Sequence, residues 1–250
     1  MRRKHAARHG EVVVVHSSDL HLDASPGYAG REAGPAALRP LRQVLQTARA
    51  VGAQVVVLAG DVFEHNRQPA ALLDQAAQLL AASALRVVIL PGNHDPLTPD
   101  SVYRRGLAAL ANVWVLGLHV EQAVVFPELE LEVWGNAHQD YGDMAPLREP
   151  RARTTRWQIA TAHGHFQPEP LDPTRFYGSW LIREAELLAT GADYVALGHW
   201  NRPARVGNGR VPAYYSGSPD LAGTVNVVRL SPQGVCVVRE PLPPDDSAAP

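Results

Sequence analysis

Three short apolar runs in the first hundred residues each end in a loop that carries side chains of metal-binding types. The runs are Val12–Val15, Val55–Leu58 and Arg86–Leu90. They are rich in β-branched residues, which favour strands. The third run leads into the loop 91–95, where a glycine turn presents an amide, an imidazole and a carboxylate. Packing does not account for this repetition, so we interpret the runs as strands that are each followed by a loop with functional side chains.

Two amphipathic segments separate these strands and predict helices. Residues 36–51 and 69–84 carry apolar side chains at a spacing of three and four, which is the period of a helix with one buried face. A βαβαβ order predicts parallel strands covered by helices. A short helix near 101–110 and a strand at 113–116 continue the pattern.

In the second half of the chain, the apolar segments 120–126 and 129–134 follow one another without a helix between them. This change predicts a second, mixed sheet. Its expected strands are 120–126, 129–134, 159–162, 194–197, 211–216, 224–230 and 235–239. A helix is expected at 180–190. We therefore predict an α/β protein, a two-sheet β-sandwich of mixed strands flanked by helices. One domain is expected over residues 11–240, with a basic tail at 1–10 and a disordered tail at 241–250.

Composition, net charge and cysteine count exclude some classes of protein. The apolar fraction is 46% and charged residues make up 19%, which is typical of a globular protein. Beyond the first ten residues, 19 basic and 25 acidic residues leave a net charge of −6, so charge gives no support for non-specific nucleic-acid binding. Cys236 is the one cysteine and excludes an intramolecular disulfide. With no apolar run of membrane-spanning length, we expect a cytoplasmic protein and no membrane partner.

Five predicted strands end in residues that bind metals, and in an open α/β sheet such strand ends converge. The residues are Asp19 and His21, Asp61, Asn93 and His94, His163, and His199. A mixed set of carboxylates, imidazoles and an amide suits Mn, Fe or Zn and lacks the thiolates of a structural zinc site. Each residue alone has an ordinary structural explanation: a turn, a helix cap, or a core histidine. All five together, in this order, are much better explained by a metal site.

This ordered series resembles the calcineurin-like metallophosphoesterases over about residues 12–220. The motifs that carry the resemblance are Asp19-Leu20-His21, Gly60-Asp61, Gly92-Asn93-His94-Asp95, His163-Gly164 and Gly198-His199. The flanking segments Ser17–Leu22, Gly60–Phe63 and Tyr215–Pro219 look most like the DNA-repair exonuclease branch of SbcD type. The resemblance implies a calcineurin-like metallophosphoesterase fold and a catalytic domain with two divalent metal ions.

The resemblance also implies a role for each residue. Asp19 and His21 would bind the first metal, and Asp61 would bridge both. Asn93, His163 and His199 would bind the second metal. His94 would act on the phosphate without ligating, by protonating the leaving oxygen or stabilising the developing charge, and Asp95 could orient His94. Two metals roughly 3.5–4 Å apart can hold a hydroxide between them for in-line attack on phosphorus.

The chain departs from the family pattern in its last motif. The family usually ends it with Gly-His-any-His, whereas this chain has Gly198-His199-Trp200-Asn201. An amide oxygen is a harder and weaker ligand than imidazole. We therefore expect Asn201 to ligate the first metal weakly, directly or through water, and that site to favour Mn or Mg-like ions over Zn.

Several residues keep two interpretations. His163 is favoured over His165 as the ligand because Gly164 follows it at the strand end, and the other member of the pair would then lie just outside the ligand set, near substrate. His65 follows the Asp61 loop closely enough to touch substrate. Trp200 sits inside a ligand motif, where base stacking and simple packing are equally good explanations.

The predicted function is dinuclear-metal-dependent hydrolysis of phosphate esters, by a phosphodiesterase or an exonuclease-like enzyme that prefers Mn. The alternatives are a small-molecule phosphodiesterase or phosphomonoesterase, and a weakly active binding module with an eroded first metal site. SbcD-type nucleases usually add a capping domain and a segment that docks on an ATPase partner. About thirty residues follow Pro219, so both elements are expected to be missing.

Overall fold

The computed structural model describes residues 10–25, 34–168 and 178–244. Its first sheet has six strands in the order β14-β13-β1-β2-β3-β4. The strands are β1 (Val12–Ser17), β2 (Val55–Ala59), β3 (Arg86–Leu90), β4 (Val113–Val115), β13 (Thr224–Ser231) and β14 (Gly234–Pro241). β1 to β4 run parallel, as the alternating pattern predicts, and β13 is antiparallel to β1.

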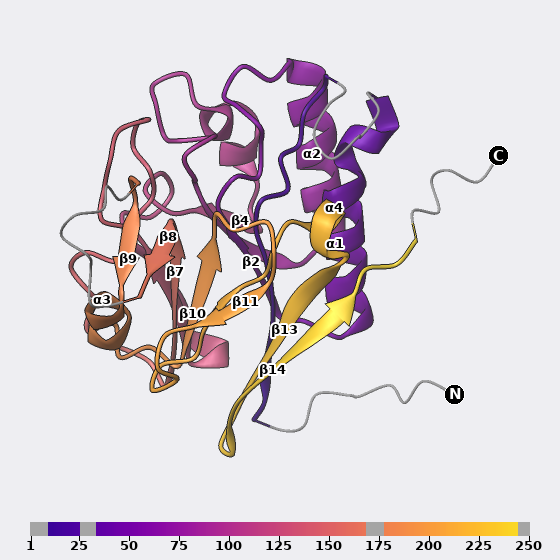
Figure 1. Cartoon of the computed structure of the whole chain (residues 1–250). Coiled ribbons are helices and arrows are strands. Elements are labelled where there is room, and N and C mark those ends of the chain that lie inside the picture. Colours follow the sequence, from indigo (N-terminus) through magenta and orange to yellow (C-terminus); the bar gives the residue numbers. More distant parts are fainter. Residues whose placement is uncertain (1–9, 26–33, 169–177, 245–250) are drawn as a thin grey trace.

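Two helices lie side by side along the first sheet (Figure 1). They are α1 (Arg39–Ala50), which continues from a 3₁₀ turn η2 (Gly34–Leu38), and α2 (Ala70–Ser83). The apolar face of α1 buries Leu41, Val44 and Leu45 against the sheet. The helices predicted at 36–51 and 69–84 are therefore confirmed, with ends shifted by a few residues. Burial of β-branched strands between these helices and a second layer explains why the strands read as continuous apolar runs.

The second sheet has the order β11-β12-β10-β7-β6-β5. Its strands are β5 (Ala123–Phe126), β6 (Leu131–Gly135), β7 (Trp157–His163), β10 (Tyr194–Gly198), β11 (Ala204–Val206) and β12 (Ala213–Tyr215). β6, β7, β10 and β12 are parallel, while β5 pairs with β6 antiparallel. β2 contacts both β7 and β10, so the two sheets pack face to face and share a core that includes Ile159 and Tyr194. The predicted two-layer arrangement is confirmed.

Two predicted helices differ from the structure. The helix expected at 180–190 begins as β9 (Leu181–Arg183), which pairs with β8 (His165–Gln167), and only α3 (Glu184–Ala189) is helical. Arg183 is extended, and its backbone N–H donates to Glu186 at 2.8 Å, which places the helix start after it. The helix expected near 101–110 is two 3₁₀ turns, η3 (Val102–Arg104) and η4 (Leu107–Ala109), because Gly106 between them has φ +90°.

The other described elements are the 3₁₀ turn η5 (Pro127–Leu129) and the short α4 (Pro219–Ala222). Among the described residues, the helices are all too short or too polar to cross a membrane. Most of the basic tail expected at 1–10, and residues 245–250 of the tail expected at 241–250, lie outside the described residues. The division into one domain over 11–240 stays a prediction.

A buried carboxylate fastens the arginine-rich loop that precedes β7. Glu132 in β6 is fully buried and accepts hydrogen bonds from the Thr154 backbone N–H at 2.7 Å and from Gln158 Nε2 at 3.0 Å. Arg151 Nε lies 3.2 Å from the same carboxylate. Arg153 pairs with Asp193 at 2.6 Å. These two arginines therefore join the loop to the second sheet.

We predict that Glu132→Ala lowers the free energy of unfolding by about 2–3 kcal/mol, because it leaves several buried donors without an acceptor. Urea unfolding followed by circular dichroism measures this change. Glu128→Ala is the matched control, since Glu128 is about half exposed and pairs with Arg86 at the surface. Exposed pairs contribute little. Equal losses in the two variants would contradict the anchoring role of Glu132.

Candidate metal centre

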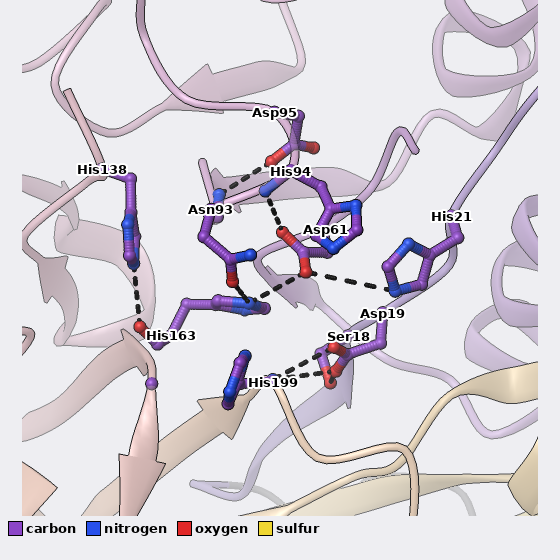
Figure 2. Close-up of polar contacts among 12 residues, drawn as sticks. Ser18, Asp19, His21, Asp61, Asn93, His94, Asp95, His138, His163 and His199 are labelled. Atoms are coloured by element: carbon purple, nitrogen blue, oxygen red, sulfur yellow. Dashed lines mark hydrogen bonds and ion pairs between the residues drawn. The ribbon is translucent and has the colours of Figure 1, made fainter. Parts of the chain in front are cut away.

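The loops that follow β1, β2, β3, β7 and β10 meet at one end of the two sheets, and Asp61 lies at their centre (Figure 2). One carboxylate oxygen of Asp61 is 3.0 Å from His163 Nε2 and 4.0 Å from His21 Nε2. The other accepts a hydrogen bond from the His94 backbone N–H at 2.9 Å. Two imidazole side chains and one backbone N–H, from three distant segments, therefore converge on one buried carboxylate.

Asp19 and His199 meet on the other side of the cluster. Both carboxylate oxygens of Asp19 accept from the His199 backbone N–H, at 3.1 and 3.0 Å. The Asp19 backbone N–H donates to Gly60 O at 3.0 Å, which ties the loop after β1 to the loop after β2. The His199 and His163 rings are 5.4 Å apart between centroids. Asp19 and His199 thus belong to the same centre as Asp61.

The backbone at this centre is strained. Asp19, His21, Asp61 and His199 have φ of +55°, +47°, +51° and +102°. Non-glycine residues rarely adopt positive φ, and such residues cluster at functional sites because the surrounding structure must hold them there. Four of the predicted ligands share this property. The surrounding structure therefore holds their backbones in an unfavourable conformation that directs their side chains toward the centre.

Glycine makes room for the central histidine. Gly60 has φ +92°, and a Cβ there would overlap the His163 ring. At Gly198 a Cβ would overlap Ala59 O and approach His163 Nδ1. His163 Nδ1 lies 2.8 Å from Ala59 O, which orients the ring so that Nε2 faces Asp61 and, at 3.0 Å, Asn93 Oδ1. The glycines of the two motifs are therefore required by the close approach of the two sheets.

His163 and His165 have different surroundings. His163 is fully buried within the cluster, whereas His165 Nδ1 accepts a hydrogen bond from Trp200 Nε1 at 3.0 Å. Of the two, His163 is the one that contacts Asp61, and the preference for it as the ligand stays a prediction. His138, for which the sequence suggested no role, lies behind it, with Nε2 2.9 Å from His163 O.

The carboxylate at the His94 ring comes from Glu64 and not from Asp95. His94 Nδ1 is 3.0 Å from Glu64 O and 3.5 Å from Glu64 Oε1. The other carboxylate oxygen of Glu64 is 2.7 Å from His21 Nδ1. Glu64 thus joins the predicted phosphate-acting histidine to a predicted metal ligand. Sequence reasoning missed Glu64, although its position three residues after Asp61 placed it in the same loop.

Asp95 supports the loop backbone. Its two oxygens accept from the backbone N–H of Gly92 at 2.7 Å and of Phe63 at 2.9 Å, and from the hydroxyl of Tyr103. The expectation that Asp95 orients the His94 ring is corrected accordingly. Asp95 shapes the turn that carries Asn93 and His94, because a fully buried carboxylate bonds the nearest donors, and here those are mostly backbone groups.

Charge is concentrated at this centre. Burial raises the pKa of Asp19. Burial opposes ionisation of Asp61 too, but the neighbouring His163 outweighs it and holds the pKa of Asp61 below its usual range. Burial works against the charged His163 ring as well, yet Asp61 and Asp19 raise the pKa of His163 to about 9. The hydrogen bond to Glu64 is the main cause that raises the pKa of His94 to about 9.

The donor set fits divalent metal ions. Two groups have potential ligand atoms within 4.8 Å of one another: His21, Asp61 and His94, and Asp19, Asp61 and His163. Asp61 belongs to both groups, as a bridging ligand would. His94, expected not to ligate, lies close enough to contribute to the first group. Buried carboxylates and imidazoles that lie this close together offer a mixed set of oxygen and nitrogen ligand atoms, of the kind that binds Mn, Fe and Zn.

A cavity of about 600 Å³ opens beside the centre and is lined by Asn93, His94, His65, Arg67, Tyr141 and Trp180, among others. His65 lies on the wall of this cavity, with Nε2 3.9 Å from Asp23 Oδ1, and its contact with substrate stays a prediction. Trp200 instead lines a second cavity with Phe166 and Arg205, and its ring stacks on Tyr215 with centroids 4.2 Å apart.

Asn201 is exposed, and its backbone oxygen accepts a hydrogen bond from the Ser218 backbone N–H.

Comparisons with known proteins identify the family to which the sequence is similar. A family model described as "Calcineurin-like phosphoesterase" matches residues 12–203. A curated subunit of the nuclease SbcCD from Bacillus subtilis (strain 168) is 27% identical over 244 residues, covering 82% of this chain. The chain spans 61% of the length of that relative.

Two solved structures share the fold. One has a TM-score of 0.61 at 14% identity and covers 93% of this chain and 100% of its own. The other, the crystal structure of TT1561 of Thermus thermophilus, has a TM-score of 0.58 at 13% identity and covers 91% of this chain and 98% of its own. At such identities the likeness shows the fold alone.

We predict that Glu64→Gln weakens the binding of one Mn²⁺ ion about 10-fold or more, because residues that orient metal-binding histidines typically contribute this much. The amide keeps the size of the side chain but removes the charge beside His21 and His94. Isothermal titration calorimetry with MnCl₂ measures the change. Glu121→Gln, an exposed glutamate outside the cluster, is the control and should match wild type. Unchanged affinity in Glu64→Gln would show that Glu64 does not orient His21.

Proposed function

The chain belongs to the calcineurin-like phosphoesterase family and is a metal-dependent hydrolase of phosphate esters, and from this premise we propose that it cleaves phosphodiester bonds in nucleic acid at a two-metal centre built around Asp61. The observation that carries the proposal is the position of Asp61, shared between two groups of potential ligands. A carboxylate in that position can hold two cations close together, which is the arrangement used for in-line displacement at phosphorus.

The residues around Asp61 divide into two proposed sets of ligands. Asp19 and His21 would hold one ion, with Asn201 as a weaker third ligand. His163, His199 and the amide oxygen of Asn93 would hold the other. The contact between His163 Nε2 and Asn93 Oδ1, at 3.0 Å, supports their assignment to the same ion. When bound, the ions would supply Lewis-acid stabilisation of the phosphate and an activated water.

His94 is the proposed proton donor to the leaving oxygen. Its Nδ1 faces Glu64, so Nε2 is the ring nitrogen that can meet a substrate in the cavity. Its side chain is 39% exposed, which leaves the ring accessible. A positioned histidine that transfers a proton to a reacting oxygen typically contributes about 10²–10⁴-fold to the rate. Asn93, the preceding residue in the loop, would stay with the metal.

Nucleic acid is favoured as the substrate by the curated relative, whose name describes part of a nuclease. Arg67 supports this choice, because it places a cation on the wall of the cavity that also contains His94. The acidic balance of the chain beyond its first ten residues favours the second candidate, a small-molecule phosphodiester or phosphomonoester. A partner protein and a cytoplasmic location are further proposals that rest on the same relative.

We predict that wild-type protein with Mn²⁺ hydrolyses single-stranded DNA faster than p-nitrophenyl phosphate, a phosphomonoester, and faster than a cyclic nucleotide. His94→Gln should lower kcat about 10²-fold or more while Mn²⁺ affinity changes little, because the residue acts on the phosphate. Steady-state kinetics and calorimetry measure the two effects. His119→Gln is the control, since His119 hydrogen-bonds Val115 away from the centre.

The outcomes separate the candidate functions. Preference for a small ester would favour the second candidate, and absence of turnover on every substrate would favour a binding module. A His94→Gln variant that loses Mn²⁺ binding would make His94 a ligand instead of a proton donor.

We predict that Asn201→His tightens the weaker of two Mn²⁺ sites and increases the preference of that site for Zn²⁺, because imidazole is a softer and stronger ligand than an amide oxygen. Competitive titration of both ions into wild type and variant measures the shift. Equal affinities in the two proteins would exclude Asn201 from the first metal site.

A further inference from the structure

An aromatic pair lines the cavity that opens at the candidate metal centre. Tyr141 and Trp180 share its wall with Asn93 and His94. The reacting phosphate would lie at the ligand end of this cavity, so the two aromatic rings lie where the rest of a substrate must extend. Neither residue was singled out by the sequence, because both lie in irregular segments without a recognisable motif.

Trp180 is held in place by its polar groups. Its backbone N–H donates to Asp143 Oδ1 at 2.6 Å, and its indole Nε1 donates to Gly142 O at 2.8 Å. Its own carbonyl accepts from the His165 N–H at 2.9 Å. The residue also has φ +59°, an unfavourable conformation for a tryptophan. Strain together with complete hydrogen bonding indicates that the fold positions this indole ring specifically.

The Trp180 ring lies against one candidate metal ligand, His199, and against His138. Its centroid is 5.7 Å from that of His199, with the planes at 78°, and 5.5 Å from that of His138, with the planes at 70°. These edge contacts fix the orientation of the ring beside the centre. A planar group attached to a phosphate at the centre would be within reach of the indole.

Tyr141 supplies a second, more open ring. It is 60% exposed and lines the cavity, so its ring is accessible to a bound molecule. Its hydroxyl lies 3.4 Å from Asn66 Nδ2, which gives the ring one polar tether. Trp200, the aromatic residue that the sequence offered for stacking, has one ring face packed on Tyr215 and lines a different cavity.

The geometry points to Trp180 and Tyr141 as a subsite for the unpaired nucleobase of the nucleotide whose phosphate is cleaved. This inference rests on the proposed phosphodiesterase function. Nucleobases have flat π-faces that stack on aromatic side chains whatever the base sequence. A base that is paired and stacked inside a duplex cannot stack on these two rings, so the subsite requires an unpaired base. Arg67, on the same cavity, is a cation suited to the phosphate of the adjoining nucleotide.

The test compares a single-stranded oligodeoxynucleotide with the same strand made of abasic tetrahydrofuran residues, both with Mn²⁺. Wild type should have a kcat/KM roughly tenfold or more higher on the base-bearing strand, the usual magnitude of stacking on one aromatic residue. Trp180→Leu and Tyr141→Leu should lose most of this preference and keep their rate on the abasic strand. Trp180→Phe should retain it, because it keeps a ring.

Binding gives a second readout that does not depend on turnover. Calorimetry should show that wild type binds thymidine 5′-monophosphate more tightly than deoxyribose 5-phosphate. Tyr141→Leu should lose most of this difference between the two monophosphates. Trp157→Leu is the matched control, since Trp157 lies at the start of β7, at the opposite end of the strand from His163. It should keep the wild-type preference for bases.

The outcomes distinguish the subsite from the proposed function. Equal hydrolysis of base-bearing and abasic strands by wild type would overturn the subsite and leave the phosphodiesterase in place. A loss in Trp180→Leu and Tyr141→Leu that is equal on both strands would also overturn it, because the residues would then be structural. Hydrolysis of neither strand, together with equal binding of the two monophosphates, would overturn both.

Discussion

The contact between His163 and the loop after β2 is the interaction on which the centre depends. His163 ends a strand of the second sheet, yet its Nδ1 lies 2.8 Å from Ala59 O of the first sheet and its Nε2 lies 3.0 Å from Asp61. One fully buried imidazole thereby links the two layers at the end where the loops converge. Because a buried imidazole and carboxylate both need partners, the packing of the sheets and the assembly of the site cannot be separated.

This contact explains features that would otherwise look unrelated. Gly60 and Gly198 flank His163 so closely that a Cβ at either position would overlap a neighbour. The positive φ angles of Asp19, Asp61 and His199 bring their side chains toward the same point. Such strain persists only where the surrounding structure holds it. The two-layer core supplies that support, since β2 is buried between α-helices on one side and β7 and β10 on the other.

Around this centre the remaining residues differ in how deeply they are buried. Asp95 is fully buried and braces the turn that carries Asn93 and His94. Glu64 is less buried and contacts both His21 and His94, so it physically connects a proposed metal ligand with the histidine proposed to act on the phosphate. Trp180 and Tyr141 lie further out on the cavity wall. The site therefore grades from a buried ionic core to an open aromatic wall.

The amino-acid sequence alone was enough to predict the parallel strands β1 to β4, most strands of the second sheet, and the convergence of Asp19, Asp61, Asn93, His163 and His199. Strand period and strand-end position are local properties of the sequence, and the sheet topology brings the strand ends together. The sequence did not predict β8 or β9, and a helix was expected over β9. Three-dimensional packing settled which carboxylate meets the His94 ring, and it is Glu64 and not Asp95. Packing also placed Trp180, and not Trp200, in the cavity with His94. The physical reason is that ring orientation and hydrogen-bond partners depend on which buried donors and acceptors the fold brings within about 3 Å, and sequence spacing does not encode that choice.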